Sequence, residues 1–205
     1  MDGPLELKQV GERLVLKGRA FDFVELTLRD EEGKEHRRQV VKHPGSVVIL
    51  PILEGVAEET KQKKAEPLTP ALSPEGRGRG ARIVMIRNSR YALGCKLDEL
   101  PAGTCEAGEA PEKTAAREVR EETGYEAATL EYLGRFHTTP GMTDELMHAY
   151  VARGLTHVGQ DLDEGEHVSV REWTAEDALA AVDVGRITDA KTILVLLWAR
   201  SRGIL

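Results

Sequence analysis

The chain is 205 residues long, with 40% hydrophobic and 31% charged residues and a formal net charge of −7. This composition suits one globular domain with a single core, excludes wholesale disorder and argues against general binding to nucleic acid. Because the longest apolar runs fall far below the roughly 18 residues of a membrane span, and the first residues lack the apolar core of a signal peptide, we expect a cytoplasmic protein without membrane or nucleic-acid partners.

The first 44 residues are predicted to form β-structure. Residues 13–17 are a short apolar segment, and residues 23–30 alternate apolar and polar side chains. The glycine-containing turn EEGK follows, and the chain returns as a second strand at 35–43, which predicts an antiparallel hairpin. We interpret residues 1–44 as an N-terminal β region and residues 45–205 as the main domain.

Two apolar strands flank an unusual segment of the main domain. Ser46–Leu53 reads SVVILPIL, as expected of a strand buried on both faces, and residues 81–87 are its expected partner. Between them, residues 56–80 hold three prolines, three glycines and no aromatic residue. This composition predicts a flexible insertion; a basic loop that binds a partner is the alternative.

Strands and helices alternate after the insertion. A helix is predicted over Pro111–Thr123, because a proline lies at its start and Gly124 just past its end. Three strands and two helices follow, at residues 128–137, 146–153, 167–173, 175–184 and 190–202. The order predicts a mixed α/β (α+β) fold with one insertion.

The helix Pro111–Thr123 carries an unusual set of carboxylates. Glu118, Glu121 and Glu122 are spaced three and four residues apart along one face, where like charges repel one another. Arg117 can pair with Glu121, but one arginine cannot neutralise three carboxylates. The face is therefore a candidate site for a hard cation such as Mg²⁺ or Mn²⁺. A solvated helix face with ion pairs is the alternative that most charge runs indicate.

The residues around these carboxylates follow a longer pattern. Its fixed positions are Gly103, Glu109, Arg117-Glu118-Val119, Glu121-Glu122 and Gly124-Tyr125, separated by five, seven, one and one residues. This pattern resembles the Nudix box, with every specified position filled. The resemblance implies the Nudix fold, an αβα sandwich around a mixed sheet, and metal-dependent hydrolysis of a nucleoside diphosphate linked to another group.

The resemblance also assigns roles within the box. It implies that Glu118 and Glu122 are the principal metal ligands and that Glu121 is an additional one. The resemblance also implies that the backbone carbonyl of Ala102 is a ligand. Arg117 would orient the carboxylates, and Glu109 would stabilise the geometry of the loop and helix. The positions with a structural role in the box are Gly103, Glu109, Arg117 and Gly124.

Motifs outside the box are similar to those of one subgroup, the ADP-ribose pyrophosphatases. These motifs are ELPAG at 99–103, Pro140 sixteen residues beyond Gly124, and residues 183–199 near the end of the chain. They imply hydrolysis of ADP-ribose to AMP and ribose 5-phosphate with Mg²⁺, or with Mn²⁺ in its place. Two alternatives stay open: a pyrophosphatase for another nucleoside diphosphate sugar such as GDP-mannose, and a non-catalytic Nudix module that senses a nucleotide.

Substrate and proton-transfer residues are also implied by the subgroup. Arg90 corresponds to an arginine that contacts the substrate, and Glu145 falls in the loop that meets the terminal ribose. The general base is Glu164 or Glu166, of which Glu166 is also a candidate metal ligand. The alternative for Arg90 is a solvated charge at the end of a strand. The alternative for the three glutamates is that they are exposed acidic residues in loops.

The N-terminal β region has a further implied role. In the subgroup this region exchanges between the subunits of a homodimer and helps to hold the adenine and the phosphates. Phe23, or its neighbour Phe21, could stack on the base, and Arg37 or Arg38 could reach a phosphate from the partner subunit. Ordinary core packing for Phe23 and solvation for the two arginines are the alternatives.

Overall fold

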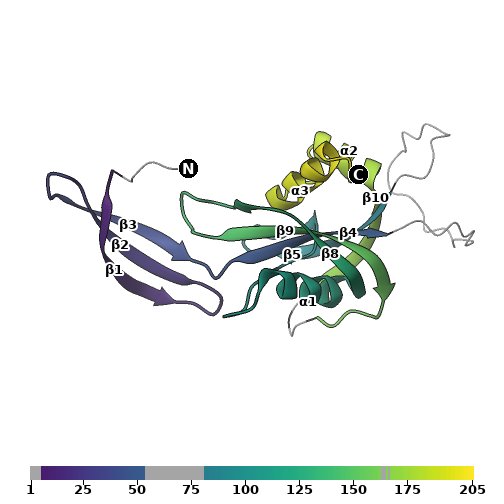
Figure 1. The fold of residues 1–205 in the computed structure, drawn as a ribbon, viewed down its shortest axis with the longest axis horizontal. Coiled ribbons are helices and arrows are strands. Elements are labelled where there is room, and N and C mark those ends of the chain that lie inside the picture. The colour runs from purple at the N-terminus through teal and green to yellow at the C-terminus, as the bar shows by residue number, and fades with distance from the viewer. Residues whose placement is uncertain (1–5, 54–80, 163–164, 166) are drawn as a thin grey trace, which may run out of the picture.

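The computed structural model describes residues 6–53, 81–162, 165 and 167–205 of the chain. These residues form two β-sheets and three helices (Figure 1). The predicted insertion at 56–80 lies outside the described residues. None of the described helices is long and apolar enough to cross a membrane.

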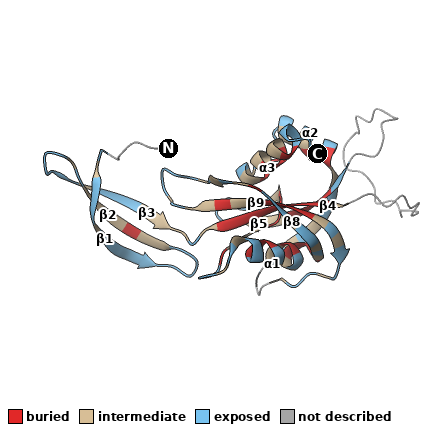
Figure 2. Ribbon diagram, viewed as in Figure 1, coloured by how far each residue is buried: buried red, intermediate tan, exposed pale blue. Residues whose placement is uncertain are grey.

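The N-terminal sheet contains β1 (Lys8–Lys17), β2 (Asp22–Arg29) and β3 (Glu35–Lys42) in antiparallel order. The predicted hairpin is confirmed as β2 and β3, whose turn contains Gly33 at φ 85°. The segment predicted at 13–17 begins earlier, at Lys8, because its polar first half pairs with the end of β2. Val24 is the only buried residue of the three strands, and the sheet lies beside the main body (Figure 2).

The main sheet is mixed, with the order β10-β5-β4-β9-β8. Its strands are β4 (Ser46–Leu53), β5 (Arg82–Arg90), β6 (Cys95–Glu99), β7 (Ala102–Thr104), β8 (Tyr125–His137), β9 (Leu146–His157) and β10 (Val168–Thr174). The central strand β4 runs parallel to β9 and antiparallel to β7. The short strands β6 and β7 were not predicted from the sequence.

The burial predicted for β4 is confirmed, since every residue from Ser46 to Ile52 is buried. Its predicted partner β5 is confirmed only at the end of β4, where Ile52 and Leu53 face Ile83 and Arg82. The rest of β5 pairs with β10 and β6. The neighbour of β4 along most of its length is β9, which the local pattern could not indicate.

Helices cover both faces of the main sheet. On one face Val47 and Ile49 of β4 pack against Ala115 and Val119 of α1 (Pro111–Thr123). On the other face Val48, Leu50 and Ile52 of β4 pack beneath α2 (Ala175–Asp183) and α3 (Ala190–Ser201). This arrangement confirms the αβα sandwich with an N-terminal antiparallel sheet (Figure 1).

The helices end where local chemistry predicts. The limits of α1 match the prediction, and α2 and α3 each stop one residue earlier than expected. Thr174 and Asp189 cap α2 and α3 by accepting hydrogen bonds from backbone N–H groups in the first turn. The two sheets join at residues 43–45. The division of the chain into an N-terminal β region, 1–44, and a main domain, 45–205, stays a prediction.

Candidate functional site

The carboxylate-bearing helix α1 is held at its C-terminal end by Gly124. This residue adopts φ 73°, and its N–H donates to the carbonyl oxygen of Arg120 over 2.8 Å. Its own carbonyl accepts the backbone N–H groups of Val158 and Gly159, at 2.8 and 3.1 Å. A Cβ atom here would lie 2.9 Å from the backbone of Gly159 and Gln160. Gly124 is therefore needed both for its conformation and for this close approach.

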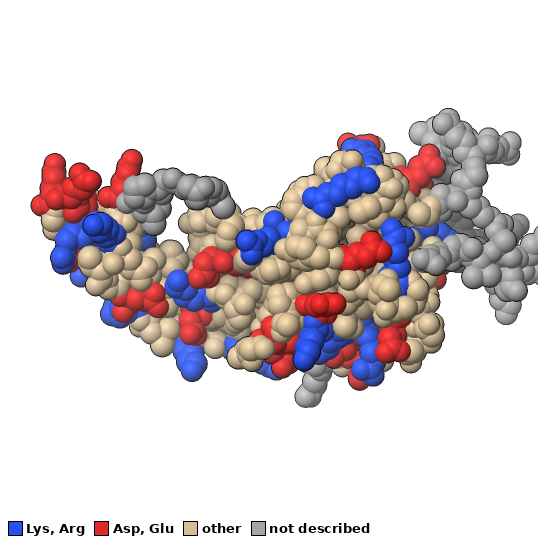
Figure 3. Space-filling view, in the orientation of Figure 1, with Lys and Arg blue, Asp and Glu red and all other residues tan. Residues whose placement is uncertain are grey.

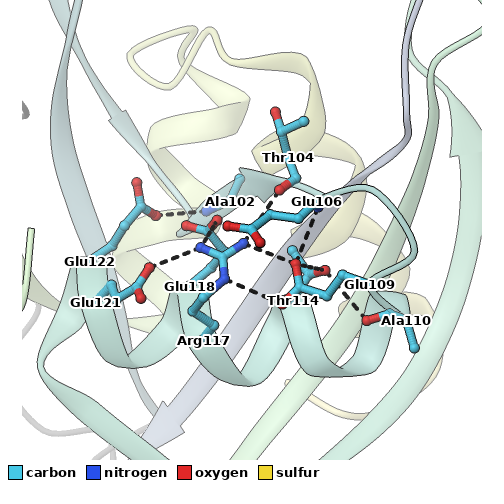
Figure 4. A network of polar contacts seen from close by, with 10 residues as sticks. All are labelled: Ala102, Thr104, Glu106, Glu109, Ala110, Thr114, Arg117, Glu118, Glu121 and Glu122. Carbon is cyan, nitrogen blue, oxygen red and sulfur yellow. Dashed lines mark hydrogen bonds and ion pairs between the residues drawn. The ribbon is translucent and has the colours of Figure 1, made fainter. Parts of the chain in front are cut away.

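Arg117 lies in the middle of the carboxylate cluster (Figure 4). Its Nη1 atom contacts Glu118 Oε1 at 2.8 Å and Glu121 Oε2 at 2.9 Å. Its Nη2 and Nε atoms lie 3.2 and 3.4 Å from the two carboxylate oxygens of Glu109. Burial acts to lower the pKa of Arg117, but Glu109 and the other carboxylates outweigh it and raise that pKa above its ordinary value. The guanidinium thus holds three carboxylates at defined positions.

Glu109 closes the loop that leads into α1. The residue before the helix, Ala110, has no side chain that can cap it. Glu109 instead accepts the Thr114 hydroxyl at 2.9 Å and the backbone N–H of Glu106 at 3.2 Å. Its hydrogen bonds, first of all that from Arg117, hold the pKa of Glu109 below its ordinary value. The carboxylate ties the loop and the first turns of the helix together.

The strand β7 supports the same cluster from the other side. Oε2 of Glu122 accepts the backbone N–H of Ala102 at 2.8 Å, and Glu122 is only 4% exposed. A Cβ atom at Gly103 would overlap the Glu118 carboxylate, so this carboxylate packs directly on the backbone of the strand. The sequence folds in this way because β7 is short and has no side chain at its centre. It brings together Ala102, Gly103, Glu118 and Glu122, all predicted to belong to one site.

The donor set fits a divalent cation. Glu118, Glu121 and Glu122 carry the hard oxygen atoms that such a cation prefers, and they could hold it beside the Ala102 backbone. The side chains of Glu118 and Glu121 are 13% and 26% exposed, which keeps them reachable. Within the described residues, no three His, Cys, Asp or Glu side chains are arranged so that they could already hold a metal ion. Arg117 contacts both Glu118 and Glu121, and a cation would share these carboxylates with it.

The two substrate residues predicted in the main domain have different surroundings. Arg90, at the end of β5, donates from Nε and Nη2 to the two oxygens of Glu99, at 2.7 and 2.5 Å. Glu145 accepts the hydroxyl groups of Ser46 and Thr138, at 2.6 and 2.5 Å. Neither side chain is simply a solvated charge. Their contact with a substrate stays a prediction.

The loop that carries Glu145 is bonded to the end of β3. Backbone hydrogen bonds join Val41 to Met142 and Asp144, at 2.9 and 3.3 Å. Asp144 also accepts the backbone N–H of His43 at 2.8 Å. Burial acts to raise the pKa of Asp144, but His43 and Lys42 together hold it below its ordinary value. The N-terminal sheet and the Glu145 loop are thereby connected at their base.

The three residues predicted in the N-terminal region do not join the cluster within one chain. Phe23, Arg37 and Arg38 lie on β2 and β3, in the sheet beside the main body (Figure 1). Arg37 contacts Glu25 at 3.5 Å, and Phe23 pairs with Val41. The exposed ring of the alternative residue, Phe21, stacks on His43 with centroids 6.1 Å apart. Glu164 and Glu166 lie outside the described residues.

Sequence reasoning missed Glu99 as a residue of interest. It is fully buried, yet it is ionisable and contacts both Arg90 and Lys191. The signal was its place as the first residue of the ELPAG motif, for which no role was inferred.

The sequence of this chain is similar to a known family and to several known proteins. The family model described as the NUDIX domain matches residues 72–195. An ADP-ribose pyrophosphatase of Bacillus subtilis (strain 168) is 36% identical over 92% of this chain and 89% of its own length. A methanol dehydrogenase activator of Bacillus methanolicus is 35% identical over 93% and 91%. A GDP-mannose pyrophosphatase of Cronobacter sakazakii is 29% identical over 93% and 90%.

A solved structure has the same fold. The crystal structure of an ADP compounds hydrolase superposes with a TM-score of 0.73 and 17% sequence identity, over 98% of this chain and 96% of the other. At this identity the likeness concerns the fold alone.

Proposed function

The chain belongs to the Nudix family, and from this membership we propose that it hydrolyses the pyrophosphate bond of ADP-ribose to AMP and ribose 5-phosphate. The observation that carries the proposal is the set of carboxylates that β7 and Arg117 hold on one face of α1. ADP-ribose is favoured as the substrate because an ADP-ribose pyrophosphatase aligns with 92% of the chain at 36% identity.

The proposed metal ligands are Glu118, Glu122 and the Ala102 carbonyl, with Glu121 and Glu166 as additional ligands. Mg²⁺ is the proposed cation, and Mn²⁺ is the alternative. A bound divalent cation supplies charge screening, polarisation of a phosphoryl oxygen and a lowered pKa for a bound water. Arg117 keeps Glu118 and Glu121 in place while they share this charge.

The residues of the chain have separate proposed roles in hydrolysis. The diphosphate lies across the carboxylate face, with Arg90 binding its oxygens through a fork suited to phosphate. Glu145 meets the terminal ribose. Glu164 or Glu166 accepts the proton of the attacking water, whose oxygen bonds to one phosphorus as the bridging P–O bond breaks. The leaving phosphate departs as part of the second product.

The proposal includes a homodimer, and the properties of the N-terminal sheet are the argument for it. Three strands with one buried side chain, Val24, do not bury enough apolar surface for a stable unit. The sheet also exposes apolar side chains, at Val10, Leu14, Val15, Leu16 and Phe21. In this proposal a second copy covers the surface, and Phe23, Arg37 and Arg38 contact the substrate across the interface, as the resemblance to the subgroup implies. A cytoplasmic location completes the proposal.

A second candidate substrate is GDP-mannose, favoured by the GDP-mannose pyrophosphatase that aligns with 93% of the chain. A panel of nucleoside diphosphate sugars with Mg²⁺, followed by mass spectrometry of the products, distinguishes the two. The proposal predicts AMP and ribose 5-phosphate from ADP-ribose at the highest kcat/KM of the panel. Cleavage of GDP-mannose without cleavage of ADP-ribose would contradict it.

A further inference from the structure

Glu99, the last residue of β6, is a fully buried carboxylate with two cationic partners. It accepts two hydrogen bonds from Arg90, at 2.7 and 2.5 Å, and one from Lys191 Nζ at 2.5 Å. Removing a carboxylate from water is costly, and an apolar cluster of similar volume often stabilises a fold at least as well as a buried ion pair. Stability alone therefore gives little reason for this arrangement, whereas a fixed geometry does.

The backbone that connects Glu99 to the carboxylate cluster is held at every residue. Its hydrogen bonds join Leu100 N–H to Thr192 Oγ1 at 2.8 Å, Pro101 O to Ile49 N–H at 2.9 Å, and Ala102 N–H to Glu122 Oε2 at 2.8 Å. Lys191 and Thr192 in turn contact Asp189, the cap of α3. Glu99 is thus placed rigidly relative to Glu122.

The guanidinium of Arg90 is fixed by Glu99, yet the Arg90 side chain is partly exposed to solvent. Glu99 binds its Nε and Nη2 atoms, and the side chain is still 41% exposed, so an anion can reach the side chain from solvent. The Glu99 hydrogen bonds, followed by the charges of Asp189 and Glu122, raise the pKa of Arg90. The guanidinium therefore stays charged close to the carboxylate that we assign to metal binding.

We propose that Glu99 is a positioning residue for hydrolysis: it fixes Arg90 in the orientation in which this side chain binds the substrate diphosphate beside the Glu122 site. The proposal rests on the proposed function, because it takes Arg90 as the diphosphate ligand. Glu99 itself touches no substrate. A tethered guanidinium loses less freedom on binding than a mobile one, so releasing it weakens binding of the diphosphate.

A double-mutant cycle tests this role. ADP-ribose hydrolysis is measured for the full chain, Glu99→Gln, Arg90→Gln and the double variant, with kcat and KM determined separately. We expect Glu99→Gln to lower kcat/KM by about 10- to 100-fold, mainly through KM, because hydrogen bonds to charged groups are of this strength. In the Arg90→Gln background the same change should cost less than about 3-fold, since Arg90 transmits the effect.

Two further variants separate positioning from folding. Lys191→Met removes the other cation but leaves the Arg90 pair, so KM should stay within about 3-fold of the parent. If Glu99→Gln alone does not fold, Glu99→Gln combined with Lys191→Met leaves no unpaired lysine and should still raise KM. A merely structural role would lower the amount of active enzyme, and thus kcat, at unchanged KM.

The outcomes distinguish this proposal from the function on which it rests. Equal effects of Glu99→Gln in both backgrounds, or an unchanged KM, overturn the positioning role while hydrolysis by the parent stands. If the parent cleaves another nucleoside diphosphate sugar, the cycle is run with that substrate and decides in the same way. A parent that cleaves none of them contradicts the proposed function, and the positioning role with it.

Discussion

The backbone N–H of Ala102 donates a 2.8 Å hydrogen bond to Oε2 of Glu122, and so joins β7 to the last turns of α1. Glu122 is 4% exposed, so the bond both satisfies a buried carboxylate oxygen and sets the rotation of the group. The carbonyl of the same residue, Ala102, is the backbone ligand that we propose for the cation. One short strand thus positions two parts of the site.

Gly103→Ala should impair the site without unfolding the protein. The new Cβ would overlap the end of the Glu118 side chain, which can swing away but then leaves its place on β7. We expect turnover to fall by about 100-fold, because displacement of a catalytic group by about an ångström has this effect. Gly141→Ala is the matched control, since a Cβ there meets nothing within 4 Å. Equal activity of the two variants would refute the close packing of Glu118 on β7.

Gly124→Ala should destabilise the fold more than a change at another left-handed glycine. Gly124 and Gly185 have similar φ angles, 73° and 71°, but only at Gly124 would a Cβ meet backbone atoms, at 2.9 Å. We expect losses of about 2 to 4 kcal/mol for Gly124→Ala and about 1 kcal/mol for Gly185→Ala. Urea unfolding measures both. Similar losses would mean that the close contact with residues 159 and 160 does not affect the stability of the fold.

Glu109 should make the fold sensitive to acid. Its pKa in the folded protein is lowered, first of all by Arg117, from an ordinary value of 4.5. The stabilisation is therefore complete above that ordinary pKa and is lost as the pH falls through the lowered one. Thermal unfolding between pH 3 and pH 7 should show a smaller loss at low pH for Glu109→Gln than for the parent. The exposed Glu126→Gln serves as control and should follow the parent.

Leu16→Glu should disrupt the proposed dimer. Leu16 lies on β1 and is 66% exposed in the single chain, so an acidic side chain there is tolerated by the monomer but not by an apolar interface. Light scattering after gel filtration should give the mass of one chain for Leu16→Glu. Val184→Glu, at a residue 78% exposed beyond α2, should keep the mass of the parent. A monomeric parent would contradict the dimer directly.

The local signals of the sequence were sufficient for α1 and its carboxylate face. Pro111 and Gly124 mark the helix ends, and the spacing of the glutamates places them on one side whatever the surroundings. The helix limits were therefore predictable from local signals, whereas the αβα sandwich was implied by the resemblance to the Nudix box. β4 was equally clear, because a run such as SVVILPIL has few stable places other than the centre of a sheet.

Features that depend on contacts between residues distant in the sequence could not be predicted from local sequence patterns. β7 has only three residues and exists through its pairing with β4, and the sequence CKLDE of β6 is too polar for a strand pattern. The burial of Glu99 depends on Lys191, which is 92 residues away. The roles of Phe23, Arg37 and Arg38 require a second chain and stay predictions. Those of Glu164 and Glu166, outside the described residues, stay predictions as well.

The most direct test of the account is ADP-ribose turnover with Mg²⁺ by Glu122→Gln compared with the parent. The amide oxygen of glutamine can still accept the Ala102 N–H, so the fold and the position of β7 should be retained, as thermal unfolding would verify. Loss of the negative charge should lower kcat by orders of magnitude, so the variant should release AMP and ribose 5-phosphate far more slowly than the parent. Normal turnover by a folded Glu122→Gln would show that the carboxylate face of α1 is not the site of the reaction.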